Sequence, residues 1–273
     1  MKIKVNNLNI ESILFSGACF RTIKENDGSI TNILKDRIVN LKQEGNYIYV
    51  ESSNNDNLEK VIRTYFDLDR DYNSINNEII KRNNDLKDMV NKCLDYKILR
   101  QDPFEMYISY ILSACNNVKR IRGIVKRISE TYGTKITYNN KDYYLFPTYE
   151  QLKDVTLSDL RKLGVGFRDE YIRDFLDKYE SLKDIDKLNS EDALNKLESI
   201  QGVGLKVASC ILLFGYGRLD VFPIDTWVRK YMSNKYNIKG SIESIKEFSK
   251  EKFKEYSGLV IQYMFHVERN EKD

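Results

Sequence analysis

The stretch SEDALNKLESIQGVGLKVASCILLFGYGRLDVFPIDTWVRKYM, residues 190–232, carries the strongest structural signal in the chain. Ser190, followed by two acidic residues, begins a helix whose apolar stripe ends at Ile200. The sequence Gln-Gly-Val-Gly at 201–204 then breaks that helix and starts another one. Two glycines around a small apolar residue let the backbone turn sharply and approach another molecule closely. This pattern predicts a helix-hairpin-helix over residues 193–215.

The start of the second helix is suited to binding an anion, because its free amides and its dipole both attract phosphate. An ordinary turn between two helices is the competing interpretation, and it is the commoner one for a lone Gly-x-Gly sequence. The charge pattern favours the interpretation that this turn binds an anion. No acidic residue occurs from Gln201 to Leu219 or from Ile111 to Ser129, although the chain has 41 acidic residues. Such windows are typical of a face that binds a polyanion.

Two residues of this stretch are candidates for chemistry. Lys206 lies in the first turn of an apolar helix, where the helix dipole and burial favour the neutral, nucleophilic amine. Asp225 follows Pro223-Ile224 and is expected to cap a helix over residues 226–231. Taken singly, a surface lysine and a helix cap are the simpler interpretations of these residues.

The rest of the chain predicts an α+β fold. Short β-branched or aromatic runs separated by turn residues predict an antiparallel sheet, and helical periodicity dominates from Asn57 onward, with a small hairpin around Asn139-Asn140. We therefore expect an N-terminal antiparallel sheet domain with covering helices over residues 1–100 and a mostly helical region over 101–273. The predicted strands are Gly17–Lys24, Ile30–Ile33, Arg37–Lys42 and Asn46–Glu51.

Composition excludes several classes of protein. The chain has 273 residues and a net charge of +3, and no apolar run approaches the length of a membrane span. Its N-terminus lacks the apolar block of a signal peptide, so we expect a cytoplasmic protein. Four cysteines without any Cys-x-x-Cys spacing, and a single histidine, argue against a disulfide framework, a metal site and a Ser-His-Asp triad. No cofactor or metal is expected.

Taken together, the glycine hairpin, Lys206 and the Phe-Pro-Ile-Asp-Thr sequence at 222–226 resemble the helix-hairpin-helix/Gly-Pro-Asp superfamily of DNA glycosylases, and the lysine resembles that of its bifunctional glycosylase/lyases. The remaining landmarks look like the 8-oxoguanine DNA glycosylase/AP lyase family in its clostridial-type bacterial form. They span almost the whole chain in the family's order, at residues 16–21, 65–69, 113–120, 163–168 and 256–265.

This resemblance implies that residues 101–273 form the helical glycosylase domains, with the catalytic Asp on the segment 222–232. It implies a bifunctional enzyme that excises 8-oxoguanine from double-stranded DNA in base excision repair. Lys206 would attack C1′ of the flipped nucleotide and form a Schiff base, and Asp225 would stabilise the positive charge that develops there. We expect a monomer in the bacterial cytoplasm, associated with the nucleoid through DNA.

The resemblance also assigns binding residues. Gly17 would face the N7 proton of 8-oxoguanine with its carbonyl, while Phe265 and Cys210 sandwich the base and Pro223 lines the pocket. Arg120 and Arg168 would read the unpaired cytosine and Phe167 would wedge into the base stack. The other residues expected at the DNA are Cys115, Asn116, Gly202 and Gly204.

Three positions depart from the family pattern. Ile261 stands where the family has the Gln that reads the lesion, and Gln262 comes one residue late, about 100° around the helix, where we expect it to point elsewhere. Cys115 replaces an Asn, and Trp227 replaces a His found in many members. Ile261 leaves open a glycosylase for a different or broader set of oxidised purines. A non-cutting reader of DNA damage and a helical interaction protein are two competing functional hypotheses.

Overall fold

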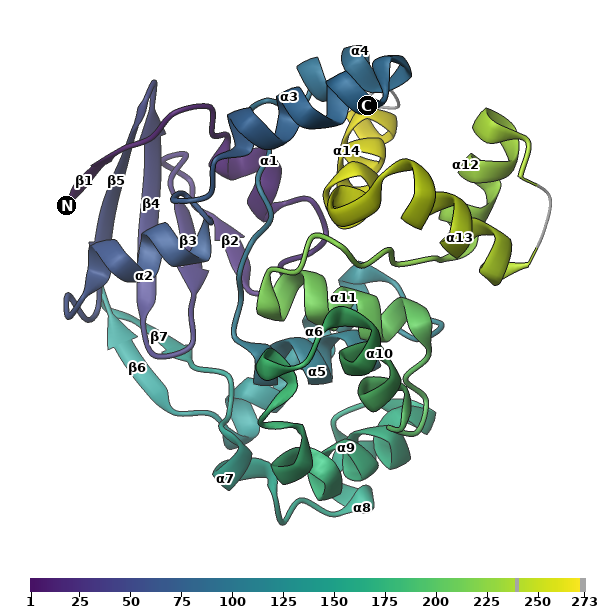
Figure 1. Ribbon diagram of the computed structural model, residues 1–273. Coiled ribbons are helices and arrows are strands. Elements are labelled where there is room, and N and C mark those ends of the chain that lie inside the picture. The colour runs from purple at the N-terminus through teal and green to yellow at the C-terminus, as the bar shows by residue number, and fades with distance from the viewer. Residues whose placement is uncertain (239–240, 271–273) are drawn as a thin grey trace.

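The computed structural model describes residues 1–238 and 241–270, and it confirms the α+β fold (Figure 1). Five antiparallel strands form one sheet in the order β1-β5-β4-β3-β2. A separate hairpin pairs β6 with β7. The strands are β1 Lys2–Lys4, β2 Thr22–Lys24, β3 Ile30–Ile33, β4 Ile38–Glu44, β5 Tyr47–Ser52, β6 Lys135–Tyr138 and β7 Lys141–Tyr144.

One face of the five-stranded sheet is buried. Along β5, Ile48 and Val50 are buried while Tyr47 and Tyr49 are exposed, which is the period-2 pattern of a half-buried strand. Leu41 of β4 pairs with Val50 and is also buried, so neighbouring strands turn their apolar residues to the same side. Helix α2 lies across this sheet (Figure 1).

Helices make up most of the remaining chain. The α-helices are α1 Ile10–Leu14, α2 Leu58–Tyr65, α3 Tyr72–Arg82, α4 Lys87–Asn91, α5 Pro103–Ile111, α6 Val118–Tyr132, α7 Tyr149–Leu152, α8 Leu157–Lys162, α9 Asp169–Leu182, α10 Ser190–Glu198, α11 Leu205–Tyr216, α12 Thr226–Tyr236, α13 Ile242–Lys252 and α14 Ser257–Asn270. Single 3₁₀ turns are η1 Asn84–Leu86, η2 Gly166–Arg168, η3 Ile185–Lys187 and η4 Lys254–Tyr256.

Helices α5 and α11 form the centre of the helical region (Figure 1). Every residue of α5 from Phe104 to Ile111 is buried, as is every residue of α11 from Val207 to Phe214. Helices that are largely apolar and covered on all sides lie in a core, so this pair is inside the molecule. The two helices meet where Tyr110 stacks on Phe214, with ring centroids 5.7 Å apart.

The last helix, α14, returns to the N-terminal region. The Tyr263 hydroxyl donates to Asn76 Oδ1 of α3 at 2.9 Å, and Ser12 Oγ of α1 lies 3.3 Å from His266 Nδ1. These buried or half-buried contacts join residues 187 and 254 positions apart in the sequence. The loop after α1 thereby shares one cavity with α11 and α14.

The sequence prediction was wrong at the first predicted strand. Only Thr22–Lys24 of the range 17–24 is a strand, because Gly17 adopts φ +97° and turns the chain. The three-residue strand β1 and the five-residue helix α1 were not predicted, since neither is long enough to show a period. Helix α12 is longer than expected and ends at Tyr236.

Candidate active site

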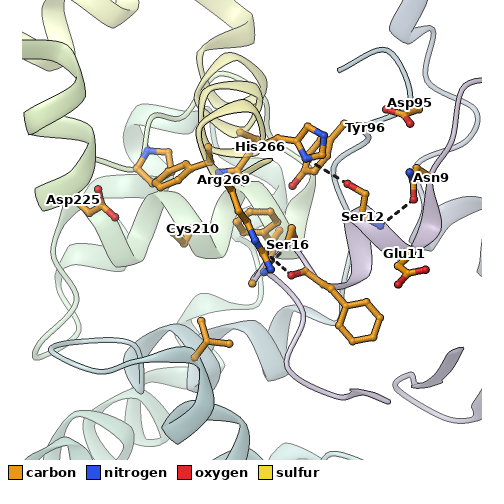
Figure 2. Close-up of a pocket in the computed structure, with 18 of the residues that line it drawn as sticks. Asn9, Glu11, Ser12, Ser16, Asp95, Tyr96, Cys210, Asp225, His266 and Arg269 are labelled. Carbon is orange, nitrogen blue, oxygen red and sulfur yellow. Dashed lines mark hydrogen bonds between the residues drawn. The ribbon is translucent and has the colours of Figure 1, made fainter. Parts of the chain in front are cut away.

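A cavity of about 870 Å³ lies between the N-terminal region and the helical region (Figure 2). Its walls come from α1 and the following loop, the segment 92–96, helices α5, α6, α11 and α14, and the residues before α12. The lining residues are Asn9, Glu11, Ser12, Phe15, Ser16, Gly17, Ala18, Lys92, Asp95, Tyr96, Tyr110, Val118, Lys206, Cys210, Phe214, Pro223, Asp225, Gln262, Phe265, His266 and Arg269.

Lys206 projects from the first turn of α11 into this cavity. Its Nζ donates a hydrogen bond to Ser113 Oγ at 2.9 Å and lies 5.5 Å from the centroid of the Tyr110 ring. The Ser113 hydroxyl donates its own hydrogen to the Tyr110 carbonyl at 2.6 Å, so its oxygen is left to accept from the lysine. Ser113 therefore fixes the direction of the Lys206 side chain.

Asp225 lines the same cavity as the N-cap of α12. Its Oδ1 accepts the Val228 amide at 2.8 Å, which confirms the predicted cap and holds the carboxylate in one orientation. Burial raises the pKa of the Cys210 thiol, with Lys206 opposing the rise and Asp225 adding to it. Lys206 and Asp225, which are 19 positions apart in the sequence, therefore both act on one buried thiol.

Two walls of the cavity could hold a flat ring. Cys210 lies one helical turn after Lys206 and is buried, and Phe265 faces the cavity from α14. The Phe265 ring is itself stacked on Trp227, with centroids 4.0 Å apart and planes 24° apart. Gly17 borders the cavity with φ +97°, a conformation that L side chains rarely adopt, so a side chain there would strain the backbone. Pro223 is also part of the lining.

On α14, Gln262 and not Ile261 borders the cavity. Ile261 has no exposed surface and does not line the cavity, whereas Gln262 does. Gln262, Phe265, His266 and Arg269 recur at i, i+3, i+4 and i+7, which is one face of a helix, and this face borders the cavity. Ile261 is turned about 100° from Gln262 and faces the core. An ungapped match to the family pattern could not detect this rotation.

The glycine hairpin has the sharp geometry that its sequence predicts. Gly202 has φ +75°, and a Cβ there would lie 2.2 Å from the Tyr171 ring, so no other residue fits without movement. The Gln201 amide donates to Asp174 Oδ2 of α9 at 2.7 Å, which anchors the turn. Gly204 caps α11, and no heavy atom lies within 4 Å of its Cβ position, so another molecule can approach this backbone.

The residues expected at the opposite base differ in exposure. Phe167 is 55% exposed, as a wedge requires, and Arg120 is exposed on α6. Arg168 is only 2% exposed, and it donates through Nε to the Ala114 carbonyl at 2.8 Å and through Nη1 to the Val165 carbonyl at 3.0 Å. In this conformation Arg168 therefore supports the loop before α6 and does not present its guanidinium to an external base, contrary to the expectation for it.

The loop before α6, which Arg168 supports, contains Cys115 and Asn116, the other two residues of this region expected at the DNA. Cys115 is exposed and adopts φ +48°, which a residue with a side chain rarely does. Asn116 Nδ2 donates to the Leu112 carbonyl at 2.9 Å, and its Oδ1 accepts the Asn117 amide at 3.0 Å. Its side chain thus stabilises the turn that starts α6.

Several residues that contact Lys206 or line the cavity have no distinct signal in the sequence. Ser113 belongs to the segment 113–120 that resembles the family, but nothing in its type or spacing indicates a contact with Lys206. His266 and Gln262 could have been found from their spacing to Phe265 along one helix face. Burial lowers the pKa of His266, so its imidazole favours the neutral form beside Ser12.

Two structural features are absent from the described residues. Within 1–238 and 241–270, no three or more His, Cys, Asp or Glu side chains are grouped as a metal ion would need. Over the same part of the chain, no helix has the length and apolar character to cross a membrane.

Two family models match the chain. The one described as 8-oxoguanine DNA glycosylase, N-terminal domain, matches residues 1–107, and the one described as HhH-GPD superfamily base excision DNA repair protein matches residues 108–255.

Relatives and solved structures point the same way. The probable N-glycosylase/DNA lyase of Methanothermobacter thermautotrophicus is 31% identical over 63% of this chain and 62% of its own length. The N-glycosylase/DNA lyase of Saccharomyces cerevisiae is 34% identical over 55% of this chain, and the match spans 44% of the relative. The matches thus cover less than two thirds of these curated relatives.

The matches to solved structures cover a larger share of both chains. The apo form of Clostridium acetobutylicum 8-oxoguanine glycosylase/lyase is 36% identical with a TM-score of 0.91, covering 96% of this chain and 94% of that one. The same enzyme in complex with double-stranded DNA containing cytosine opposite to 8-oxoG is 35% identical with a TM-score of 0.91, covering 98% of this chain and 94% of that one.

Proposed function

Because the chain belongs to the 8-oxoguanine DNA glycosylase/AP lyase family of the HhH-GPD superfamily, we propose that it is a bifunctional DNA glycosylase and AP lyase that excises 8-oxoguanine from duplex DNA. The observation that carries this proposal is the meeting of Lys206 and Asp225 in one cavity of about 870 Å³. A cavity of this size has room for a whole nucleoside.

The reaction requires the damaged nucleotide to leave the double helix, because a half-buried lysine cannot reach a sugar inside the base stack. Ser113 holds Lys206 Nζ in the cavity, at a distance of 2.9 Å from its own hydroxyl oxygen. The amine, in its neutral form, adds its lone pair to C1′ of the flipped deoxyribose. The bond from C1′ to the base breaks, and its electron pair leaves with the oxidised base, which takes up a proton.

Asp225 acts on the charge that develops during this step. As the base leaves, C1′ and the ring oxygen carry positive charge, and a fixed carboxylate stabilises that charge more than it stabilises the neutral ground state. The Val228 amide keeps the carboxylate in place, so little reorganisation accompanies the reaction. Because Asp225 is both the cap and the charged group, the start of α12 positions the catalytic carboxylate.

Strand cleavage follows from the covalent intermediate. After the amine loses a proton and the sugar ring opens, Lys206 is joined to C1′ as a protonated Schiff base. That cation acidifies the proton on C2′, and removal of the proton allows the 3′ phosphate to leave by β-elimination. Hydrolysis of the Schiff base then returns Lys206 to its starting state.

Recognition of the lesion uses the walls of the cavity. We assign the base to the space between Cys210 and Phe265, with the Gly17 carbonyl accepting the N7 proton that distinguishes 8-oxoguanine from guanine. Gln262 takes the role of reading the base edge, since it lines the cavity and Ile261 does not. The hypothesis of a broader set of oxidised purines rested on Ile261, and the place of Gln262 in the cavity supports 8-oxoguanine instead. A non-cutting reader of damage has no need of Lys206 in the cavity.

The hairpin and the loop before α6 complete the proposed interface with DNA. The amides around Gly202 and Gly204 bind the backbone phosphate beside the lesion, and Phe167 fills the stack from which the base departs. Pro223 lines the pocket, and Arg120 contacts the opposite strand. We propose that the enzyme works as a monomer on nucleoid DNA in the cytoplasm of a bacterium.

A strand-cleavage assay tests this function. A labelled duplex with one 8-oxoguanine opposite cytosine is incubated with the protein, and base release and nicking are followed separately on a denaturing gel, with and without alkali. The proposal expects both products from the damaged duplex and neither from an undamaged duplex of the same sequence. Absence of base release, or equal cleavage of both duplexes, would refute it.

A further inference from the structure

One face of α12 continues away from the cavity as an aromatic and basic surface. Trp227, Lys230, Tyr231, Asn234 and Lys235 recur at i, i+3, i+4, i+7 and i+8, and together with Glu268 of α14 they line a surface depression of about 290 Å³. That spacing places the five residues of α12 on one side of the helix. We refer to these five residues as the α12 face.

The α12 face is continuous with the cavity. Trp227 stacks on Tyr231 at 5.1 Å on one side and on Phe265 at 4.0 Å on the other, and Phe265 lines the cavity. Asp225, also in the cavity, is the N-cap of the same helix. A molecule held at Asp225 would therefore reach the α12 face without crossing any other element.

The charge of the α12 face fits a polyanion. From Thr226 to Ile242 the sequence contains no acidic residue, and Lys230 and Lys235 are exposed. Lys235 Nζ lies 5.6 Å from the centroid of the Tyr231 ring, so the amine and the aromatic surface are presented together. Of the residues that line the depression, only Glu268 is acidic. Lysines beside aromatic rings are typical of surfaces that bind a nucleic-acid strand.

The spacing of the two lysines agrees with a strand that follows the helix. At ~1.5 Å per residue, Lys230 lies about 7.5 Å beyond Asp225 along α12 and Lys235 about 15 Å beyond it. Along the duplex axis a DNA strand advances ~3.4 Å per nucleotide, so with α12 parallel to that axis these distances correspond to roughly two and four nucleotides.

From these observations we infer that the α12 face is a second DNA contact, which binds the phosphodiester backbone of the lesion-bearing strand roughly two to four nucleotides from the flipped residue. This inference rests on the proposed function, because it takes the position of the flipped nucleotide from the assignment of Lys206 and Asp225. The phosphates contact Lys230 and Lys235, while Trp227 and Tyr231 form the apolar floor between them.

The test is the salt dependence of binding. The ligand is a duplex with a stable tetrahydrofuran abasic analogue, which cannot be cleaved, and binding is followed by fluorescence anisotropy over a series of salt concentrations. Each phosphate contact contributes about 0.9 to the slope of log K against log salt. The variant Lys230→Ala/Lys235→Ala should therefore have a slope shallower by about 1.8 than that of the wild type. The matched control, Lys4→Ala/Lys42→Ala, removes two exposed lysines from the sheet on the opposite side of the molecule (Figure 1).

Shortening the duplex locates the contact. When the lesion strand is trimmed from each end in turn, wild-type affinity should fall as one particular end comes within about four nucleotides of the analogue, and the double variant should not respond to that trimming. Trp227, the single tryptophan of the chain, should also change its fluorescence on binding.

The outcomes separate this inference from the proposed function. If the double variant keeps the wild-type slope, or if the control loses as much slope as the double variant, the α12 face is not a DNA contact, even when the wild type excises 8-oxoguanine normally. If the wild type does not prefer the abasic duplex to an undamaged one, the proposed function fails, and the assigned position of the flipped nucleotide fails with it.

Discussion

Replacing Gln262 tests the proposal that this residue reads the base. Gln262 is 9% exposed and lines the cavity on the same helix face as Phe265. In Gln262→Ala the base edge would enter the cavity and find no amide partner. An unsatisfied buried polar group costs about 1–3 kcal/mol. Since ~1.4 kcal/mol corresponds to a factor of ten, we expect 8-oxoguanine excision to fall by roughly 5- to 150-fold in kcat/KM.

The assay compares two activities of one enzyme. Single-turnover excision from an 8-oxoguanine duplex depends on reading the base, whereas strand cleavage at a preformed abasic site does not, because no base is present. Gln262→Ala should lower the first activity and leave the second within about twofold. Ile261→Val is the matched control, because it changes the neighbouring residue in the core and should affect neither activity.

Either of two results would refute the reasoning. A parallel loss of both activities in Gln262→Ala would mean that the residue supports the fold of the site and does not read the base. A selective loss in the Ile261→Val control, with none in Gln262→Ala, would return the reading position to Ile261 and show that the helix face is wrongly assigned.

Three further predictions concern other parts of the structure. Asp225→Asn should lower single-turnover base release by roughly 10²-fold or more and destabilise the fold by ~1 kcal/mol; an unchanged rate in the folded variant would leave Asp225 as a cap alone. Phe167→Ala should keep its melting temperature, because the side chain is 55% exposed, yet excise more slowly; an unchanged rate contradicts a wedge. Burial raises the pKa of Glu105 to about 7 despite Arg21 at 3.4 Å, so the folded state holds a proton that the unfolded state releases near pH ~4.5. The free energy of unfolding should therefore fall between about pH 4.5 and 7, by on the order of 3 kcal/mol, and be flat above pH 7. Urea titrations of Glu105→Gln should show no such fall. If the variant shows the same fall as the wild type, a group other than Glu105 causes it.

The sequence predicted the helical region well because its signals are local. The cap of α12 by Asp225 and the break at Gly202 each depend on a few neighbouring residues, and the structure has both. Most residues of α5 and α11 are apolar, which indicates burial without any knowledge of their neighbours.

The rest of the site depends on contacts between distant segments. Ser113 meets Lys206 across 93 positions, and Ser12 meets His266 across 254, and neither pair leaves a periodic signal in the sequence. Arg168 has the residue type and position of a DNA contact, but in the structure its guanidinium donates to the carbonyl groups of Ala114 and Cys115 in the loop before α6. The rotation of α14 that exposes Gln262 to the cavity is likewise set by packing.

The central claim is that Lys206 is the covalent nucleophile, and borohydride trapping tests it most directly. Borohydride reduces a Schiff base to a stable amine, so incubation with an 8-oxoguanine duplex should yield a protein–DNA adduct, and peptide mapping should locate the modification at Lys206. Lys206→Gln should form no adduct while still binding the duplex. An adduct at the wild-type level from Lys206→Gln, or mapping to a different lysine in the wild type, would contradict the account.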